Sequence, residues 1–284
     1  WGSHKRNVLL DSGSFDFVID GIIELSLILE QFVKDMHHQP GGGGMGGVAP
    51  VRPNAEEGVE ATLVQGFCRM AWLNEPGVAA DGSWSMESPR KLCLCPGSKT
   101  DLWRKTYYTP LLVMDNAPAL VAKIDPNIAL TAQVEVTMRN VGNNFDQAGI
   151  YIRFDALNWI KTGIEFVEGE PRLSCVVTRK TSDWSTQPWV HNRSETLSPS
   201  EFTNFHIRLT QTGDGSYAVE ASLSGLEKSW EFIRITHMDL VGFREGSVGV
   251  YACCPVKQNG GAKGFSATFQ DFSVQRGVKF SHTN

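Results

Sequence analysis

The feature that most constrains the fold of this chain is a succession of short runs in which apolar and polar residues alternate. The runs lie at 130–139, 149–154, 159–166, 173–179, 205–210, 217–223, 230–235, 247–252 and 265–274. Successive side chains of a strand point to opposite faces, so a period of two predicts strands and not helices. Turn signals separate the runs, among them Gly142-Asn143-Asn144, Glu168-Gly169-Glu170-Pro171 and Gly213-Asp214-Gly215. Many short strands joined by such turns predict an all-β sandwich or jelly roll.

Two consecutive runs predict a hairpin with one unusual face. Residues 149–154 place Ile150, Ile152 and Phe154 on one face, and 159–166 do the same with Ile160, Thr162, Ile164 and Phe166. The opposite face carries Tyr151, Arg153, Trp159, Lys161, Gly163 and Glu165. Only 155–158 lie between the two runs, which is typical of a hairpin. We expect the first face to be core and the second, which gathers aromatic and charged side chains, to hold a candidate site.

The segment before residue 55 has a different pattern. Residues 14–38 predict an amphipathic helix, with Ser14 as its cap. Asp20, Glu24 and Glu30 interrupt its apolar run and disfavour a transmembrane span, so we expect the helix to pack on the domain or on a partner. The Gly- and Pro-rich residues 40–54 predict a flexible linker. The predicted organisation is an N-terminal segment at 1–39, a linker at 40–54, a β domain at 55–277 and a tail at 278–284.

Composition and cysteine spacing exclude several classes of function. The formal net charge of −5 disfavours nucleic acid as a partner, because phosphate neutralisation needs a basic surface. The six cysteines occur as C-x-C, C-C and single residues, without the paired C-x-x-C spacing of structural zinc sites. We expect free thiols in a reducing compartment, hence a cytoplasmic protein, and we expect neither a metal nor a cofactor.

Several ordered blocks carry a family resemblance. They are 72–76 followed by Trp84 and 100–108, then 145–153, then 159–166 with 176–179 and 182–185, and finally 249–255 and 269–272. Together they resemble the DUF1349 family over roughly 58–277. The resemblance implies a concanavalin A-like jelly roll of two antiparallel sheets, as in the lectin/glucanase superfamily. It implies no settled activity: some relatives look like sugar-binding modules, and one is described as a regulator of the glycolytic enzyme enolase. Residues before 55 inherit nothing from it.

If the strands pair as the resemblance suggests, one sheet holds a ligand groove. The hairpin contributes Tyr151, Arg153, Trp159, Lys161 and Glu165, with Gln147 at its start. Arg179 is expected to join them, because it alternates with Cys175 and Val177 on the neighbouring run. Asp101 and Trp103 are two residues apart in an earlier block, so both can point into the same groove. Asp183 and Trp184 are expected in a loop at the rim. Aromatic rings cover the apolar faces of a sugar, while Arg, Asp, Glu and Gln bind its hydroxyl groups.

Four interpretations of this face stay open. It is a non-catalytic groove for a carbohydrate or a carbohydrate-like metabolite, or a surface that docks on a metabolic enzyme such as enolase. Alternatively, Arg153, Lys161, Glu165 and Arg179 form a structural ladder of ion pairs. The last interpretation is a glycoside hydrolase that uses Glu165, the only carboxylate in 159–166. That chemistry normally needs two opposed carboxylates.

Overall fold

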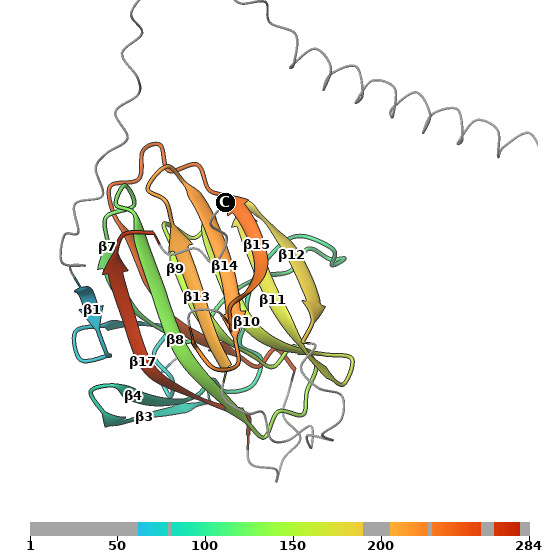
Figure 1. Cartoon of the computed structure of the whole chain (residues 1–284). Coiled ribbons are helices and arrows are strands. Elements are labelled where there is room, and N and C mark those ends of the chain that lie inside the picture. Colours follow the sequence, from blue (N-terminus) through green and yellow to red (C-terminus); the bar gives the residue numbers. More distant parts are fainter. Residues whose placement is uncertain (1–61, 79–80, 190–204, 227–228, 257–263, 279–284) are drawn as a thin grey trace, which may run out of the picture. The chain divides into compact units, whose positions relative to one another are not determined.

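The structure is a computed structural model that describes residues 62–78, 81–189, 205–226, 229–256 and 264–278, and this part is all-β (Figure 1). One antiparallel sheet has the order β15-β14-β13-β8-β17-β4-β3, with β1 beside β17. Its strands are β1 (Thr62–Gln65), β3 (Ser83–Ser88), β4 (Lys91–Cys95), β8 (Leu130–Arg139), β13 (Phe205–Gln211), β14 (Ser216–Ser222), β15 (Glu231–His237) and β17 (Ser266–Arg276).

The second antiparallel sheet has the order β12-β11-β10-β9-β16-β7-β2. Its strands are β2 (Ala71–Leu73), β7 (Ala119–Ile124), β9 (Gln147–Arg153), β10 (Asn158–Val167), β11 (Glu170–Arg179), β12 (Thr181–Pro188) and β16 (Gly246–Cys253). A separate hairpin consists of β5 (Leu102–Arg104) and β6 (Val113–Asp115). The nine predicted runs are all strands, and their observed bounds differ from the predicted ones by at most a few residues.

The core lies between the two large sheets, which makes the domain a β-sandwich. Val134 and Val136 of β8 are fully buried in the same cluster as Ile150 and Ile152 of β9 and Ile160 of β10. The alternation seen in the sequence therefore sorts the hairpin as predicted, with its isoleucines facing the opposite sheet. Burial of these branched side chains, each contributing about 1.5–3 kcal/mol, is the main force that holds the layers together.

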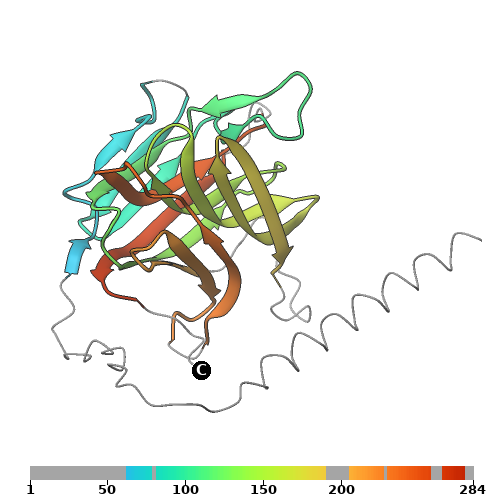
Figure 2. The same ribbon diagram turned by 90° about the horizontal axis from the view of Figure 1, so that it is seen from above.

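The second sheet is buried on its outer face as well. Leu102 and Trp103 of the β5–β6 hairpin pack there against Tyr151, Trp159 and Val176. Figure 2, a view from above, shows this short hairpin outside the two main layers. Double coverage explains why eight consecutive residues of β10 are buried, although antiparallel sheets commonly leave one face to solvent.

Tight turns fix the register of the strands that matter for the site. Val167 pairs with Glu170, so the β10–β11 turn has only Glu168 and Gly169 at its centre, with φ of 53° and 86°. Positive φ at both central residues is the type I′ geometry that suits two-residue hairpins. Glu170 and Pro171, expected in the turn, instead belong to β11.

The predicted helix at 14–38 and the linker at 40–54 lie outside the described residues. Among the residues that the structure does describe, no helix is long and apolar enough to cross a membrane.

Candidate functional site

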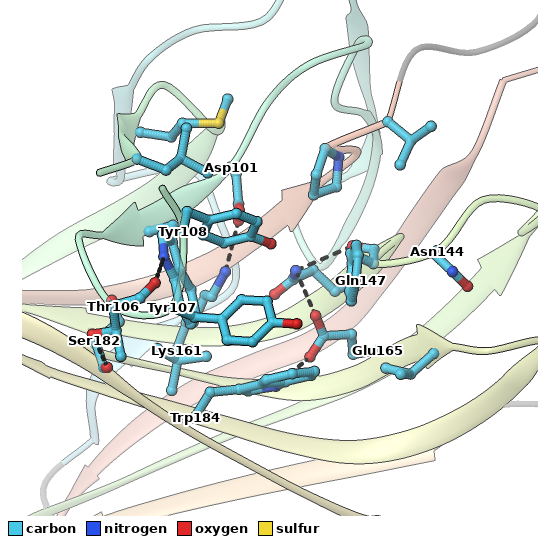
Figure 3. Close-up of a pocket in the computed structure, with 18 of the residues that line it drawn as sticks. Asp101, Thr106, Tyr107, Tyr108, Asn144, Gln147, Lys161, Glu165, Ser182 and Trp184 are labelled. Carbon is cyan, nitrogen blue, oxygen red and sulfur yellow. Dashed lines mark hydrogen bonds and ion pairs between the residues drawn. The ribbon is translucent and has the colours of Figure 1, made fainter. Parts of the chain in front are cut away.

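A cavity of about 990 Å³ opens between the outer face of the second sheet and the β5–β6 hairpin. It is lined by seven of the eleven residues singled out from the sequence, namely Asp101, Trp103, Gln147, Lys161, Glu165, Asp183 and Trp184. Figure 3 shows the rings of Tyr107 and Tyr108 above Trp184, with Glu165 and Gln147 beside these rings and the ammonium group of Lys161 directed to Asp101. The strands thus bring side chains that are 60 or more residues apart into one site.

A buried ion pair lies at the base of this cavity. Lys161 Nζ is 2.8 Å from Asp101 Oδ1, and the two side chains are 2% and 12% exposed. The same carboxylate oxygen accepts the backbone N–H of Leu102 at 2.7 Å. Burial lowers the pKa of Lys161, but the negative charges of Asp101 and Glu165 and the hydrogen bond to Asp101 outweigh it, and the net pKa is raised. Lys161 is therefore an ammonium group throughout the neutral range.

Glu165 is the third buried ionisable group of the cavity, and its hydrogen bonds come from neutral groups. Gln147 Nε2 donates to Oε1 at 3.2 Å, while Ser174 Oγ and Trp184 Nε1 donate to Oε2 at 2.6 and 2.9 Å. Burial raises the pKa of Glu165 above its ordinary value, although Lys161 and the bonds from Ser174 and Trp184 act in the opposite direction. The indole N–H can only donate, so it favours the ionised carboxylate.

Aromatic rings form much of the remaining wall. Trp103 meets Tyr108 edge to face with ring centroids 5.9 Å apart, and it meets Trp184 in the same way at 6.5 Å. Trp103 Nε1 donates to the carbonyl oxygen of Thr106, which anchors the loop that carries both tyrosines. Tyr107 is 90% exposed at the mouth, and Trp184 is 39% exposed. The site therefore offers flat apolar surface next to charged groups.

A pair of glycines keeps the sheet bare beneath these side chains. Gly163 lies between Lys161 and Glu165 on β10 and pairs with Gly149 on β9. A Cβ added at Gly163 would lie 1.9 Å from the carbonyl oxygen of Ala148, which no neighbour could accommodate without moving backbone. Because neither glycine has a side chain, the space above them is open to the side chains of Lys161 and Glu165, which lie on either side of Gly163.

Two predicted residues support the site from below and do not line it. Tyr151 and Trp159 are 0% and 2% exposed and pack against each other with ring centroids 6.0 Å apart. The parity that placed them on the outer face is right, but the β5–β6 hairpin covers that face. Nothing in the strand pattern shows a hairpin from 40 residues upstream lying on top.

The two predicted arginines also lie away from the cavity lining. Arg153 binds Asp115 through two hydrogen bonds of 2.6 and 2.9 Å, which fastens β9 to the end of β6. For Arg179 the face assignment is wrong: Lys161 pairs with Val176, so Val176 shares its face and Arg179 has the opposite parity. Arg179 instead donates to the carbonyl oxygen of His237.

Two further expectations need correction. Asp183 and Trp184 belong to edge strand β12 and not to a loop, and Asp183 is held by Arg234 at 2.6 Å. The ladder of ion pairs is not found in the described chain either, because Arg153 and Lys161 each pair with an aspartate from the covering segment.

Sequence reasoning missed several residues of the site, some in the cavity lining and one, Ser174, that supports Glu165. Tyr107 and Tyr108 lie in the block at 100–108, but they are in a loop, where alternation gives no direction. Ser174, which holds Glu165, is on β11 with the parity of Val176 and was hidden by the wrong face assignment of that strand. In the described residues no cluster of three or more His, Cys, Asp or Glu side chains is suitable for a metal ion.

Relatives of known sequence match most of the domain. The family model described as "Protein of unknown function (DUF1349)" matches residues 72–277. Regulation of enolase protein 1 of Saccharomyces cerevisiae is 31% identical over 203 residues, which cover 72% of this chain and 87% of the relative. An uncharacterized protein of Emericella nidulans is 28% identical over 172 residues, covering 57% of this chain and 76% of that protein.

Solved structures agree with the architecture. A functionally unknown protein from Saccharomyces cerevisiae matches with a TM-score of 0.61 and 29% identity, over 75% of this chain and all of that one. A GH43 protein of Bacillus licheniformis, as a mutant, matches with a TM-score of 0.51 and 15% identity, over 73% of this chain and 37% of its own, and this likeness concerns the fold alone. By the length of the family match and the identity to the yeast relative, the chain belongs to the DUF1349 family.

Proposed function

We propose that the cavity binds a carbohydrate or a carbohydrate-like metabolite without turning it over, in a domain with the concanavalin A-like jelly-roll topology. The observation that carries the proposal is the buried, hydrogen-bonded Glu165 beside the half-exposed indole of Trp184. An indole face suits the apolar face of a sugar ring, and a fixed carboxylate selects for hydroxyl donors. The cavity volume of about 990 Å³ is at the upper end of the usual range for small-molecule sites.

The arrangement of the acids favours binding over hydrolysis. A glycosidase needs two carboxylates that face each other across the bond to be cleaved. Here Asp101 is committed to Lys161, which is four residues from Glu165 on the same strand, or about 13 Å along it. Asp183, another acid of the lining, is held by Arg234, and we assign Glu165 to recognition.

A second candidate function is docking on a glycolytic enzyme. It is favoured by the name of the yeast relative, which concerns the regulation of enolase. The covering hairpin also presents exposed apolar side chains, with Tyr107 at 90%, Leu111 at 69% and Val113 at 50% exposure. A cytoplasmic location fits both functions, and the six free cysteines support it.

Calorimetric titration with a panel of mono- and disaccharides tests the first proposal. We expect saturable binding that Trp184→Ala abolishes. Trp84→Ala is the matched control, because Trp84 is also 39% exposed but lies on β3 of the other sheet. Equal loss in both variants, or no binding of any sugar, would refute the proposal. If no sugar binds, saturable binding to purified enolase that is weakened by Tyr107→Ala and Leu111→Ala would favour docking.

A further inference from the structure

The charges at the base of the cavity do not balance. Asp101, Lys161 and Glu165 are all buried and all line it, and they comprise two acids and one base. The ammonium group of Lys161 is hydrogen-bonded to Asp101. Glu165, once ionised, carries a negative charge that has no cation bonded to it, because its three donors are neutral groups. Buried charges that are not paired are costly, so this position favours a ligand that brings the missing charge.

The partners of Glu165 support this view. An amide, a hydroxyl and an indole N–H donate to it, and none of these groups carries a charge. Among the described residues Glu165 forms no ion pair. Its Oε1 accepts a single bond, from Gln147, and a carboxylate oxygen has two lone pairs. One acceptor position on Oε1 therefore stays available to a donor that enters the cavity.

The rest of the lining has the same sign of charge. The acids of the lining are Asp101, Glu165, Glu168 and Asp183, whereas the bases are Lys99 and Lys161, four against two. Arg234 neutralises Asp183 from outside, which still leaves the acids in excess. Electron-rich ring faces of Trp103, Trp184 and the tyrosines complete the wall, and such faces attract cations. A phosphorylated ligand would meet repulsion here.

We infer that the cavity selects a ligand with a positively charged amino group on a hydroxylated ring, the chemistry of the amino sugars, over neutral or phosphorylated sugars of the same size. The ammonium group donates to Glu165 Oε1 while the ring lies against Trp184. The inference rests on the proposed binding function and adds the charge of the ligand to it.

The test compares four ligands of one ring type by calorimetry, just below neutral pH: glucosamine, N-acetylglucosamine, glucose and glucose 6-phosphate. We expect glucosamine to bind about tenfold more tightly than the two neutral sugars, because its ammonium group brings a full positive charge to the carboxylate, whereas a hydroxyl donor brings none. Glucose 6-phosphate should bind most weakly. Glu165→Gln should abolish the preference for the amine, and Glu245→Gln, an exposed acid paired with Lys123, should retain it.

The possible outcomes separate this inference from the function beneath it. Equal affinity for glucosamine and glucose would overturn the selectivity for a cation and leave the sugar site standing. If none of the four ligands nor any other sugar binds, the proposed function itself fails. Should Glu165→Gln not fold, the wild-type protein still decides: as pH is lowered through the titration of Glu165, glucosamine affinity should fall more steeply than glucose affinity. Parallel pH profiles for the two would contradict the inference.

Discussion

Replacing Lys161 by methionine should destabilise the domain through one identifiable cause. The substitution keeps most of the aliphatic side chain but removes the ammonium group, 2.8 Å from an Asp101 side chain that is 12% exposed. Breaking a buried ion pair typically costs about 3–5 kcal/mol because the remaining charge is stranded. Asp101 still accepts the backbone N–H of Leu102, so we expect the lower end, about 3 kcal/mol. Many domains have only about 5–15 kcal/mol of stability in total.

Urea denaturation followed by tryptophan fluorescence measures this loss. Lys123→Met is the matched control, since Lys123 forms an ion pair of 2.7 Å with Glu245 while the two side chains are 78% and 60% exposed. It should change the free energy of unfolding by less than about 1 kcal/mol. Adding Asp101→Asn to Lys161→Met should recover at least about 1 kcal/mol, because it removes the stranded charge. Equal losses in the two lysine variants, or no recovery in the double variant, would refute the reasoning.

Three further predictions concern the carboxyl group of Glu165, the thiol of Cys93 and the backbone at Gly163. Burial raises the pKa of Glu165 above its ordinary 4.5, so the native state holds the carboxyl proton more tightly than the unfolded state does. The contribution of Glu165 to the free energy of unfolding should therefore decline as pH rises above about 4.5. Urea denaturation of Glu165→Gln across this pH range should lack that decline. A hydrogen bond from Cys95 lowers the pKa of Cys93 to about 6, so iodoacetamide near pH 7 should modify Cys93 before the exposed Cys68, as followed by mass spectrometry, and equal rates would contradict this. In the same denaturation assay, Gly163→Ala should lower the free energy of unfolding by about 1–3 kcal/mol, because the added Cβ meets backbone. Gly142→Ala should change it little, because a Cβ added there meets nothing within 4 Å.

Strand periodicity was enough to predict the sandwich and the inner face of the hairpin. In β9 and β10, burial on one face imposes strict alternation, and a slip of one residue would turn every isoleucine outward. The same logic correctly placed Lys161 and Glu165 on the outer face. Local sequence specifies such features because the two faces of a strand differ in what they contact.

The parts of the site that could not be predicted depend on contacts between distant segments. Alternation gave the face of Trp159 but not its depth, because depth depends on the β5–β6 hairpin that covers it. Arg179 was misplaced for a local reason: alternation within 173–179 does not say which of its faces is the outer one, and the turn at Glu168 and Gly169 sets Val176 opposite Lys161. Tyr107 has a φ of 75° in an irregular loop, where neither period applies.

The β5 and β6 strands pair with each other, in a two-stranded sheet apart from both large ones. Thr106 donates to the carbonyl oxygen of Ser182 on β12, whereas residues 107–111 belong to no ladder of the sandwich. If the cavity binds a ligand as we propose, exchange of 107–111 for another sequence should alter which molecules are admitted, while strand β10, which supplies both Lys161 and Glu165, keeps its alignment. Chimeras that swap this stretch between relatives would therefore test whether it sets the choice of ligand in the proposed site.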